Sequence, residues 1–280
     1  MAAIGFLNPA PLMWSFEHEP ERSSLLERYT IDSTTPAECA RRLQAGEADL
    51  GLIPVAAYPG SSSLRIVPGC AVASLGCIRS IVLVVRAAVG VRSVRRVATD
   101  TSSLTSTAYT RILFERYWET PAEFIALPPD LESMLAAADA ALLIGDPALL
   151  ALENREAREL RTGEKLLYLD LGHEWHTFTG VPWVSAFWAI RSEALEETGV
   201  PAQTVIEDLQ RSRDRGLEHT EDLVVEWSER IAVPASTIRA YLTTNIHYLL
   251  DPECLRGLEL FYRYAAECGV LPPAPPLRLL

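Results

Sequence analysis

The densest group of hydroxyl side chains in this sequence is Thr99–Thr107, with seven serines or threonines in nine residues. It lies between the apolar segment Val94–Ala98, a predicted strand, and a predicted helix over Ala108–Tyr117. The first turn of a helix has unpaired N–H groups and a partial positive charge, so hydroxyls there can help to bind a carboxylate. Capping the helix needs only one hydroxyl and is the alternative interpretation. We favour anion binding.

A second polar loop follows the predicted strand Ile4–Leu7 and begins with Asn8. An asparagine amide can both donate and accept hydrogen bonds. Asn8 stands where a strand is expected to end, which is where open α/β sheets bind ligands. The alternative, equally supported by local propensity, is an Asx turn before Pro9.

Two serines, Ser74 and Ser80, flank the loop before the predicted strand Ile78–Val85 and are candidates to face a ligand. Neighbouring side chains alternate in direction along a strand, so only one of Arg79 and Ser80 is expected to face it. We interpret Arg79 as a surface or interlobe charge because arginines are usually exposed. The sequence leaves open which of the two faces the ligand.

Asp146 follows the predicted strand Ala140–Ile144 and has two interpretations. It can cap the helix that begins after it, or it can orient a substrate hydroxyl as a cleft carboxylate. His173 and His176 are predicted to lie in a short loop without a third ligand, so we expect no metal site. The polar run Asn154–Glu164 is also predicted to be a solvated loop. The sequence contains no P-loop, G-x-G-x-x-G or G-x-S-x-G motif, so nucleotide cofactors and triad hydrolysis lack support.

Composition narrows the class of protein. With 280 residues the chain can form one large domain or two ordinary ones, and its net charge of −12 argues against a nucleic-acid-binding protein. A locally positive cleft for an anionic small molecule remains compatible with that charge. We find no apolar run long enough to span a membrane and no secretory signal at the N-terminus, so we expect a cytoplasmic protein. The five cysteines lack metal spacing and are expected to be reduced.

The elements that must position these groups follow each other in the same order twice. An amphipathic segment, Glu38–Ala45, leads into the apolar strand Leu50–Ile53, and Leu131–Ala138 leads into Ala140–Ile144 with similar spacing. Alternation of short strands and helices predicts an α/β fold with largely parallel sheets. We therefore predict two similar lobes whose polar loops face each other across a cleft.

Two longer apolar strands, Ser80–Val85 and Trp183–Ile190, are expected to cross between the lobes and to form a hinge. The first lobe is then discontinuous, with residues 1–85 and 190–280, and the second comprises residues 86–189. The ligand is expected to lie between them.

On these segments the chain resembles the chorismate dehydratases of the futalosine route to menaquinone, which have two-lobed periplasmic-binding-protein-like (type II) folds. The matching pieces occur in the expected order and cover most of the chain: FLNPAPL, GEADLGLIPVAAY, the S-x-G-x-x-x-S segment Ser74–Ser80, DTSSLTSTAYTRILF, ADAALLIGDPAL, DLGHEWHTFTGVPWVSAFW and GLELFYRYAAECGVL.

The resemblance implies a hydro-lyase that converts chorismate, a dianion, into 3-[(1-carboxyvinyl)oxy]benzoate and water. Aromatisation drives this reaction, so no cofactor or metal is expected. The family's cleft residues correspond to Asn8 and Ser80 as catalytic residues, and to Ser103, Thr105 and Ser106 as carboxylate donors. Ser74 and Asp146 are added as candidate substrate-binding residues. No general base is evident in these loops. The substrate's own enolpyruvyl carboxylate is one candidate, and the sequence does not identify the proton acceptor.

Two other functions stay open. The related enzyme of the same route makes a dihydroxynaphthoate from cyclic dehypoxanthine futalosine, and we would expect it to have a catalytic histidine in the cleft. The other alternative is a non-catalytic binding or sensor protein for a small aromatic carboxylate. No nucleic-acid or membrane partner is expected, and the sequence does not determine the oligomeric state.

Overall fold

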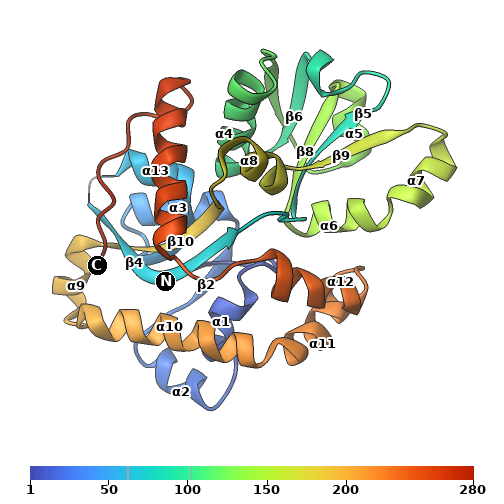
Figure 1. Cartoon of the computed structure of the whole chain (residues 1–280). Coiled ribbons are helices and arrows are strands. Elements are labelled where there is room, and N and C mark those ends of the chain that lie inside the picture. Colours follow the sequence, from blue (N-terminus) through green and yellow to red (C-terminus); the bar gives the residue numbers. More distant parts are fainter. Residues whose placement is uncertain (62, 102) are drawn as a thin grey trace.

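Two five-stranded sheets form the framework of the part of the chain that the computed structural model describes, residues 1–61, 63–101 and 103–280. Figure 1 shows them in separate halves of the molecule. The first sheet has the order β2-β1-β3-β10-β4. Its strands are β1 (Ala2–Ile4), β2 (Asp32–Thr34), β3 (Leu50–Pro54), β4 (Leu64–Ser74) and β10 (Trp183–Arg191). The second has the order β7-β6-β8-β5-β9. Its strands are β5 (Ile81–Arg86), β6 (Arg96–Asp100), β7 (Glu123–Leu127), β8 (Ala140–Ile144) and β9 (Leu166–Asp170).

The predicted repeat is confirmed by the way these strands pair. In the first sheet β1 pairs in parallel with β2 and β3, and in the second β6 pairs in parallel with β7 and β8. An antiparallel strand then follows in each, β10 beside β3 and β5 beside β8. The two sheets thus share one topology, and the expected α/β class with two lobes is correct. The expectation of largely parallel sheets was wrong: β10 and β5 pair antiparallel with both neighbours, because each enters its sheet from the other half.

The strands that cross between the halves join different sheets from those expected. β5 lies in the second sheet and β10 in the first. The expected boundaries, after residue 85 and before residue 190, therefore separate each strand from the sheet in which it pairs. Both strands are apolar on both faces, so their composition marks them as central without naming their partners. We propose that the lobes divide near residues 75–80 and 171–182.

Two helices occupy stretches that the sequence predicted to be loops. α7 (Arg155–Thr162) lies within the polar run, and α8 (Leu171–Thr179) carries His173 and His176. The buried side of α7 carries a charged residue where a helix usually has apolar ones. Arg158 is buried there and makes ion pairs instead of hydrophobic contacts. The side chain of Asp170 caps α8 by accepting a hydrogen bond from the His173 N–H. Both loop predictions were therefore wrong, because ion pairs support the first helix and an aspartate cap begins the second.

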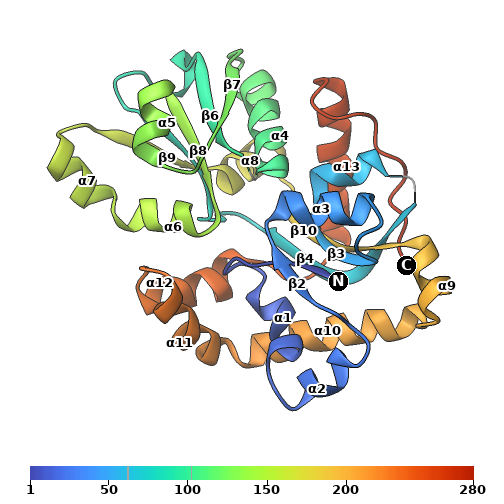
Figure 2. The same cartoon turned by 180° about the vertical axis from the view of Figure 1, so that it is seen from behind.

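The remaining helices cover the two sheets, as Figure 2 shows from behind. With the first sheet lie α1 (Ala10–Glu17), α2 (Glu21–Leu26), α3 (Pro36–Gln44), α9 (Ser192–Thr198), α10 (Ala202–Glu218), α11 (Thr220–Arg230), α12 (Ala235–Ala240) and α13 (Pro252–Glu267). With the second lie α4 (Leu104–Ile112), α5 (Leu131–Ala137) and α6 (Gly145–Glu153). In the described residues, no helix is both long and apolar enough to cross a membrane.

A stack of aromatic rings joins the two halves near the start of β10. Tyr109 on α4 lies 3.8 Å from the Trp183 ring and 4.0 Å from the Phe261 ring, centroid to centroid. All three side chains are fully buried. Aromatic pairs of this kind contribute about 1 kcal/mol beyond their area burial. They hold α4, and hence the hydroxyl-rich loop before it, against the first lobe.

Candidate functional site

A small cavity of about 50 Å³ lies between the two sheets and brings together most of the residues that the sequence singled out. Its lining comes from strand ends and helix starts of both halves. The residues are Ile4, Phe6, Asn8, Pro36, Pro54, Ser80, Ile81, Ser103, Leu104, Thr105, Ser106, Ile144, Gly145, Ser185 and Ala186. Asn8, Ser80, Ser103, Thr105 and Ser106 are therefore neighbours in space, although almost a hundred positions separate the first from the last.

Asn8 follows β1 and lies one turn before the body of α1. Its Oδ1 atom is buried and has no hydrogen-bond partner among the described residues. An Asx turn would have paired this oxygen with a backbone N–H nearby, so that alternative is not supported. A buried amide oxygen without a partner destabilises the free protein by about 1–3 kcal/mol. It is a group that a bound ligand can satisfy.

The hydroxyl-rich loop enters the cavity from the second sheet, between β6 and α4. Ser103 occupies the N-cap position of α4 but makes no capping hydrogen bond, and its Oγ is also buried without a partner in the described structure. The capping interpretation therefore does not explain Ser103. Thr105 Oγ1 accepts a hydrogen bond of 3.2 Å from the Ala56 N–H in the opposite half. Ser102 lies outside the described residues.

Helix N-termini converge on the cavity from both halves. Leu104, Gly145 and Pro36 are the first residues of α4, α6 and α3, and all three line it. Each N-terminus contributes a partial positive charge of about half an elementary charge. Among the described lining residues there is no arginine or lysine, so these dipoles and the hydroxyls provide the attraction for an anion.

Ser80, rather than Arg79, faces the cavity, which answers the question that the sequence left open. The Arg79 side chain points away and pairs with Glu153 Oε1 on α6 at 3.2 Å. Thr237 on α12 donates to the same oxygen at 3.0 Å. Arg79 is thus a half-exposed interlobe charge, as predicted.

Ser74 and Asp146 do not line the cavity. Ser74 Oγ lies 3.1 Å from the carbonyl oxygens of Gly76 and Cys77 and shapes the loop that leads to Ser80. Asp146 Oδ1 accepts a hydrogen bond from the Leu7 N–H of the other half, and burial raises the pKa of its carboxyl above the ordinary value. Ser74 thus has a local structural contact and Asp146 a contact between the halves, and neither residue lines the cavity that the other candidates share.

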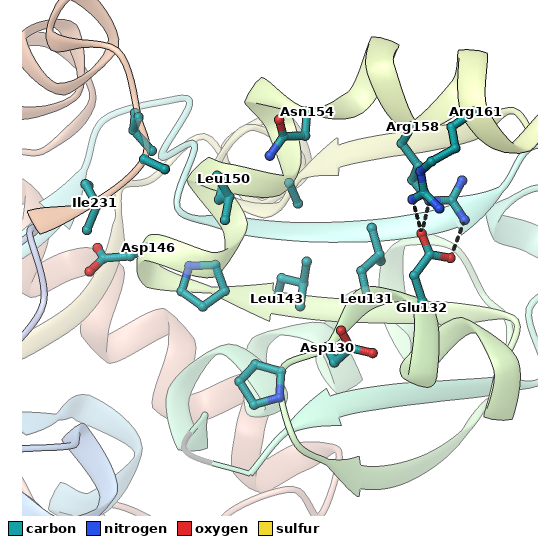
Figure 3. Close-up of a pocket in the computed structure, with 15 residues that line it drawn as sticks. Asp130, Leu131, Glu132, Leu143, Asp146, Leu150, Asn154, Arg158, Arg161 and Ile231 are labelled. Carbon is teal, nitrogen blue, oxygen red and sulfur yellow. Dashed lines mark hydrogen bonds and ion pairs between the residues drawn. The ribbon is translucent and has the colours of Figure 1, made fainter. Parts of the chain in front are cut away.

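Asp146 lines a different and larger hollow of about 480 Å³, between α6, the start of α5 and residues 231–233 of the first half (Figure 3). Arg158 and Arg161 lie at one end of it, and both pair with Glu132, at 2.9 and 3.2 Å. Glu164 pairs with Arg158 as well, at 2.8 Å, so carboxylates already engage both arginines and the hollow offers an anion less than its size suggests. Size alone therefore does not identify the site.

Sequence reasoning missed Ser185, Phe6 and Pro36 as lining residues. Ser185 lies on β10 where the register with β4 shifts between Val184 and Ala186, and β-bulges of this kind often adjoin active sites. Its Oγ accepts a hydrogen bond of 2.8 Å from Trp183 Nε1. A lone hydroxyl in the apolar run WVSAFW was the available signal.

No described residue that lines the cavity has an acidic, basic or imidazole side chain. The arrangement can therefore bind and orient an anion, but its side chains offer no ordinary general base. The described His247, Asp251 and Cys254 lie close enough together to hold a metal, but they lie outside the cavity. The Asp251 carboxylate caps α13 through the Cys254 N–H at 2.8 Å, which accounts for this grouping.

Two lobes of matching topology around a shared cavity define a protein of the periplasmic-binding-protein fold. A protein of Archaeoglobus fulgidus has a similar structure, with a TM-score of 0.71, 17% identity and coverage of 96% of this chain and 97% of that one. A Candida albicans protein described as having the generic periplasmic binding protein fold matches with a TM-score of 0.66, 12% identity and coverage of 100% and 96%. The aliphatic sulphonate binding protein SsuA of Escherichia coli matches with a TM-score of 0.63, 15% identity and coverage of 100% and 92%.

The chain belongs to the menaquinone biosynthesis family, whose sequence profile matches residues 1–267. It is also similar to the chorismate dehydratase of Thermus thermophilus. The two are 31% identical over 259 residues, which is 89% of this chain and 90% of that protein.

Proposed function

We propose that the protein is a chorismate dehydratase that eliminates water from chorismate to give 3-[(1-carboxyvinyl)oxy]benzoate. The observation that carries this proposal is a cavity with helix N-termini around it and unpartnered polar atoms on Asn8 and Ser103, whose described lining residues include no titratable side chain. Such a cavity suits a small dianion. The choice of chorismate as the substrate rests on membership of the menaquinone biosynthesis family and on similarity to a chorismate dehydratase.

The proposed chemistry needs positioning more than it needs a strong base. The ring C–H bond beside the ether oxygen breaks, its electron pair enters the ring, and the neighbouring hydroxyl leaves with the proton as water. The product ring is aromatic, which drives the reaction. Since no lining side chain that the structure describes is an ordinary base, we assign the proton transfer to the substrate's own enolpyruvyl carboxylate.

In this proposal Asn8 orients the reacting end of the substrate, and Ser80 donates a hydrogen bond to a carboxylate. Ser103, Thr105 and Ser106 hold a carboxylate at the start of α4. Holding the reacting atoms close together in a dry cavity can supply about 7–11 kcal/mol of the barrier.

The lobes must separate for the substrate to bind. Sites for small molecules usually enclose about 300–1,000 Å³, whereas this cavity measures about 50 Å³. We therefore take the structure to be a closed form whose halves open about the two crossing connections, as in other hinged binding folds. We also propose that the enzyme works in the cytoplasm.

The test is to incubate purified protein with chorismate, without added metal or nucleotide, and to follow the products by chromatography and mass spectrometry. Loss of one water with formation of the enolpyruvyl benzoate is the expected result. Chorismate that binds but stays intact would indicate that the protein is a binding or sensor protein and not an enzyme. Failure to bind it would direct the search to the futalosine-derived substrate, although no described histidine lines the cavity.

A further inference from the structure

Arg79, the residue directly before Ser80, has an unusual backbone conformation. Its φ is +58°, in the left-handed region that is uncommon for residues other than glycine. Residues held in such conformations are strained by about 1–3 kcal/mol and persist only where their surroundings fix them. Something must therefore hold the turn that presents Ser80 to the cavity.

The carboxylate of Asp170 holds this turn. Its Oδ1 accepts a hydrogen bond of 3.0 Å from the Ile78 N–H, and its Oδ2 accepts one of 2.7 Å from the Arg79 N–H. Successive N–H groups beside a left-handed residue form a concave anion-binding site. Here an anionic side chain of the chain itself fills that site.

Asp170 also joins the two connections between the halves. It ends β9 and leads through α8 into β10, whereas the turn at Ile78–Ser80 leads into β5. A Cβ atom on Gly172 would lie 2.6 Å from the Gly76 carbonyl oxygen, so α8 lies directly against the loop before Ser80. From the first half, Asn245 Nδ2 donates to the Cys77 carbonyl oxygen at 3.0 Å. Asp170 and α8 thus hold the turn on one side, and Asn245 of the first half holds it on the other.

We propose that Asp170 is a positioning residue for the reaction, holding the Ile78–Arg79 turn so that the Ser80 hydroxyl faces the bound substrate. The inference rests on the proposed function, because it assigns Ser80 to the substrate. Asp170 does not line the cavity, so its effect on Ser80 passes through the turn, and its second contact is the cap of α8. Its loss should therefore reduce turnover through Ser80 and leave the other cavity residues in place.

The first test is Asp170→Asn, which keeps the shape of the side chain but replaces its two acceptor oxygens with one carbonyl oxygen and an NH2 group. We expect kcat to fall about 10- to 100-fold, with a much smaller change in KM. The matched control is Asp130→Asn, because Asp130 caps α5 through the Ser133 N–H at 2.9 Å and does not line the cavity. It makes the same substitution at another helix cap, where asparagine caps about as well as aspartate, and should keep kcat within about twofold.

Two further variants separate positioning from simple loss of stability. In a Ser80→Ala background, Asp170→Asn should lower kcat by no more than about twofold, because both changes remove the same interaction. Arg79→Gly should restore part of the kcat lost in Asp170→Asn, since glycine adopts a positive φ without strain. Arg79→Ala, which also removes the guanidinium but keeps the strain, should not restore it.

The outcomes distinguish this inference from the proposed function. A wild-type protein that leaves chorismate unchanged would contradict the function itself. An active wild type in which Asp170→Asn and Asp130→Asn have equal kcat would overturn the role of Asp170. So would an undiminished effect of Asp170→Asn in the Ser80→Ala background.

Discussion

At the scale of single residues, the site depends on polar atoms that the folded chain leaves unsatisfied. The buried Asn8 Oδ1 and Ser103 Oγ atoms have no partner among the described residues, although nearly all buried polar groups in proteins are paired. Both atoms belong to residues at the ends of β1 and β6, the equivalent strands of the two sheets. The site is thus built from the same position in each half.

Asn8→Ala should lower kcat strongly while the fold survives. The change removes the amide that orients the reacting end of the substrate, and the loss of one such preorganised group typically lowers kcat by about 100-fold or more. The measurement is steady-state turnover of chorismate together with a thermal unfolding curve. Asn154→Ala is the control, because Asn154 lines the larger hollow and not the cavity. Full turnover by Asn8→Ala would show that Asn8 has no part in the mechanism.

The pH dependence of kcat should be flat between about pH 6 and pH 9. No described lining residue has an acidic, basic or imidazole side chain, and the substrate carboxylates stay ionised over this range. The nearby Tyr241 phenol does not contribute, because burial raises its pKa far above the ordinary value. The measurement is kcat at saturating chorismate in buffers of constant ionic strength. A bell-shaped profile with an apparent pKa near about 6.5 would instead indicate a histidine.

At the scale of secondary-structure elements, close packing of helices fixes where the loops begin. α10 approaches α1 so closely that a Cβ on Gly216 would lie 2.1 Å from the Pro11 carbonyl oxygen and 2.5 Å from its Cα. Pro11 is in the first turn of α1, a few residues after Asn8. The position of Asn8 therefore depends on a glycine on a helix that is distant in the sequence.

Gly216→Ala should destabilise the protein by about 2 kcal/mol and also lower kcat. The added methyl forces α1 away from α10, and overpacking of this kind outweighs the roughly 1 kcal/mol that alanine gains in a helix. The measurement is the free energy of unfolding from urea titration, with chorismate turnover alongside. For comparison, Gly60→Ala makes only ordinary contact, its nearest neighbour being Gln44 Nε2 at 3.6 Å, and should change little. Equal stability of the two variants would contradict the packing argument.

At the scale of the whole molecule, direct hydrogen bonds between the halves hold the cavity closed. The Leu7 N–H donates to Asp146 Oδ1 at 3.3 Å, and the Ala56 N–H donates to Thr105 Oγ1 at 3.2 Å. Each of these bonds joins the first half to the second. A neutral hydrogen bond such as that to Thr105 contributes about 1 kcal/mol, and one to a carboxylate such as Asp146 about 1.5–3 kcal/mol, so opening at these points costs only a few kcal/mol.

Ligand binding should therefore slow amide hydrogen exchange at Leu7 and Ala56. A ligand that bridges the halves stabilises the closed form and lowers the population in which these N–H groups meet solvent. The measurement is exchange with and without the enolpyruvyl benzoate product, compared with the amide of Leu83 in the middle of β5. Exchange at Leu7 and Ala56 that does not change at saturating product would argue against an opening hinge.

The sequence by itself determined the α/β class and the repeated order of elements, and it singled out residues that the structure places around one cavity. Each of these depends on local chemistry: apolar periodicity, an asparagine at a strand end, and hydroxyls before a helix. Asn8, Ser80, Ser103, Thr105 and Ser106 lie at such positions, and the cavity contains all of them.

Only the tertiary structure decided which sheet β5 and β10 join, that Arg158 can be buried in a helix, and that Ser74 and Asp146 lie outside the cavity. Strand partners, ion pairs and side-chain direction depend on groups that are distant in the sequence. The Asp170 carboxylate shows this most clearly. Its local pattern indicates only a helix cap, and its bonds to Ile78 and Arg79 exist because two separate connections meet there.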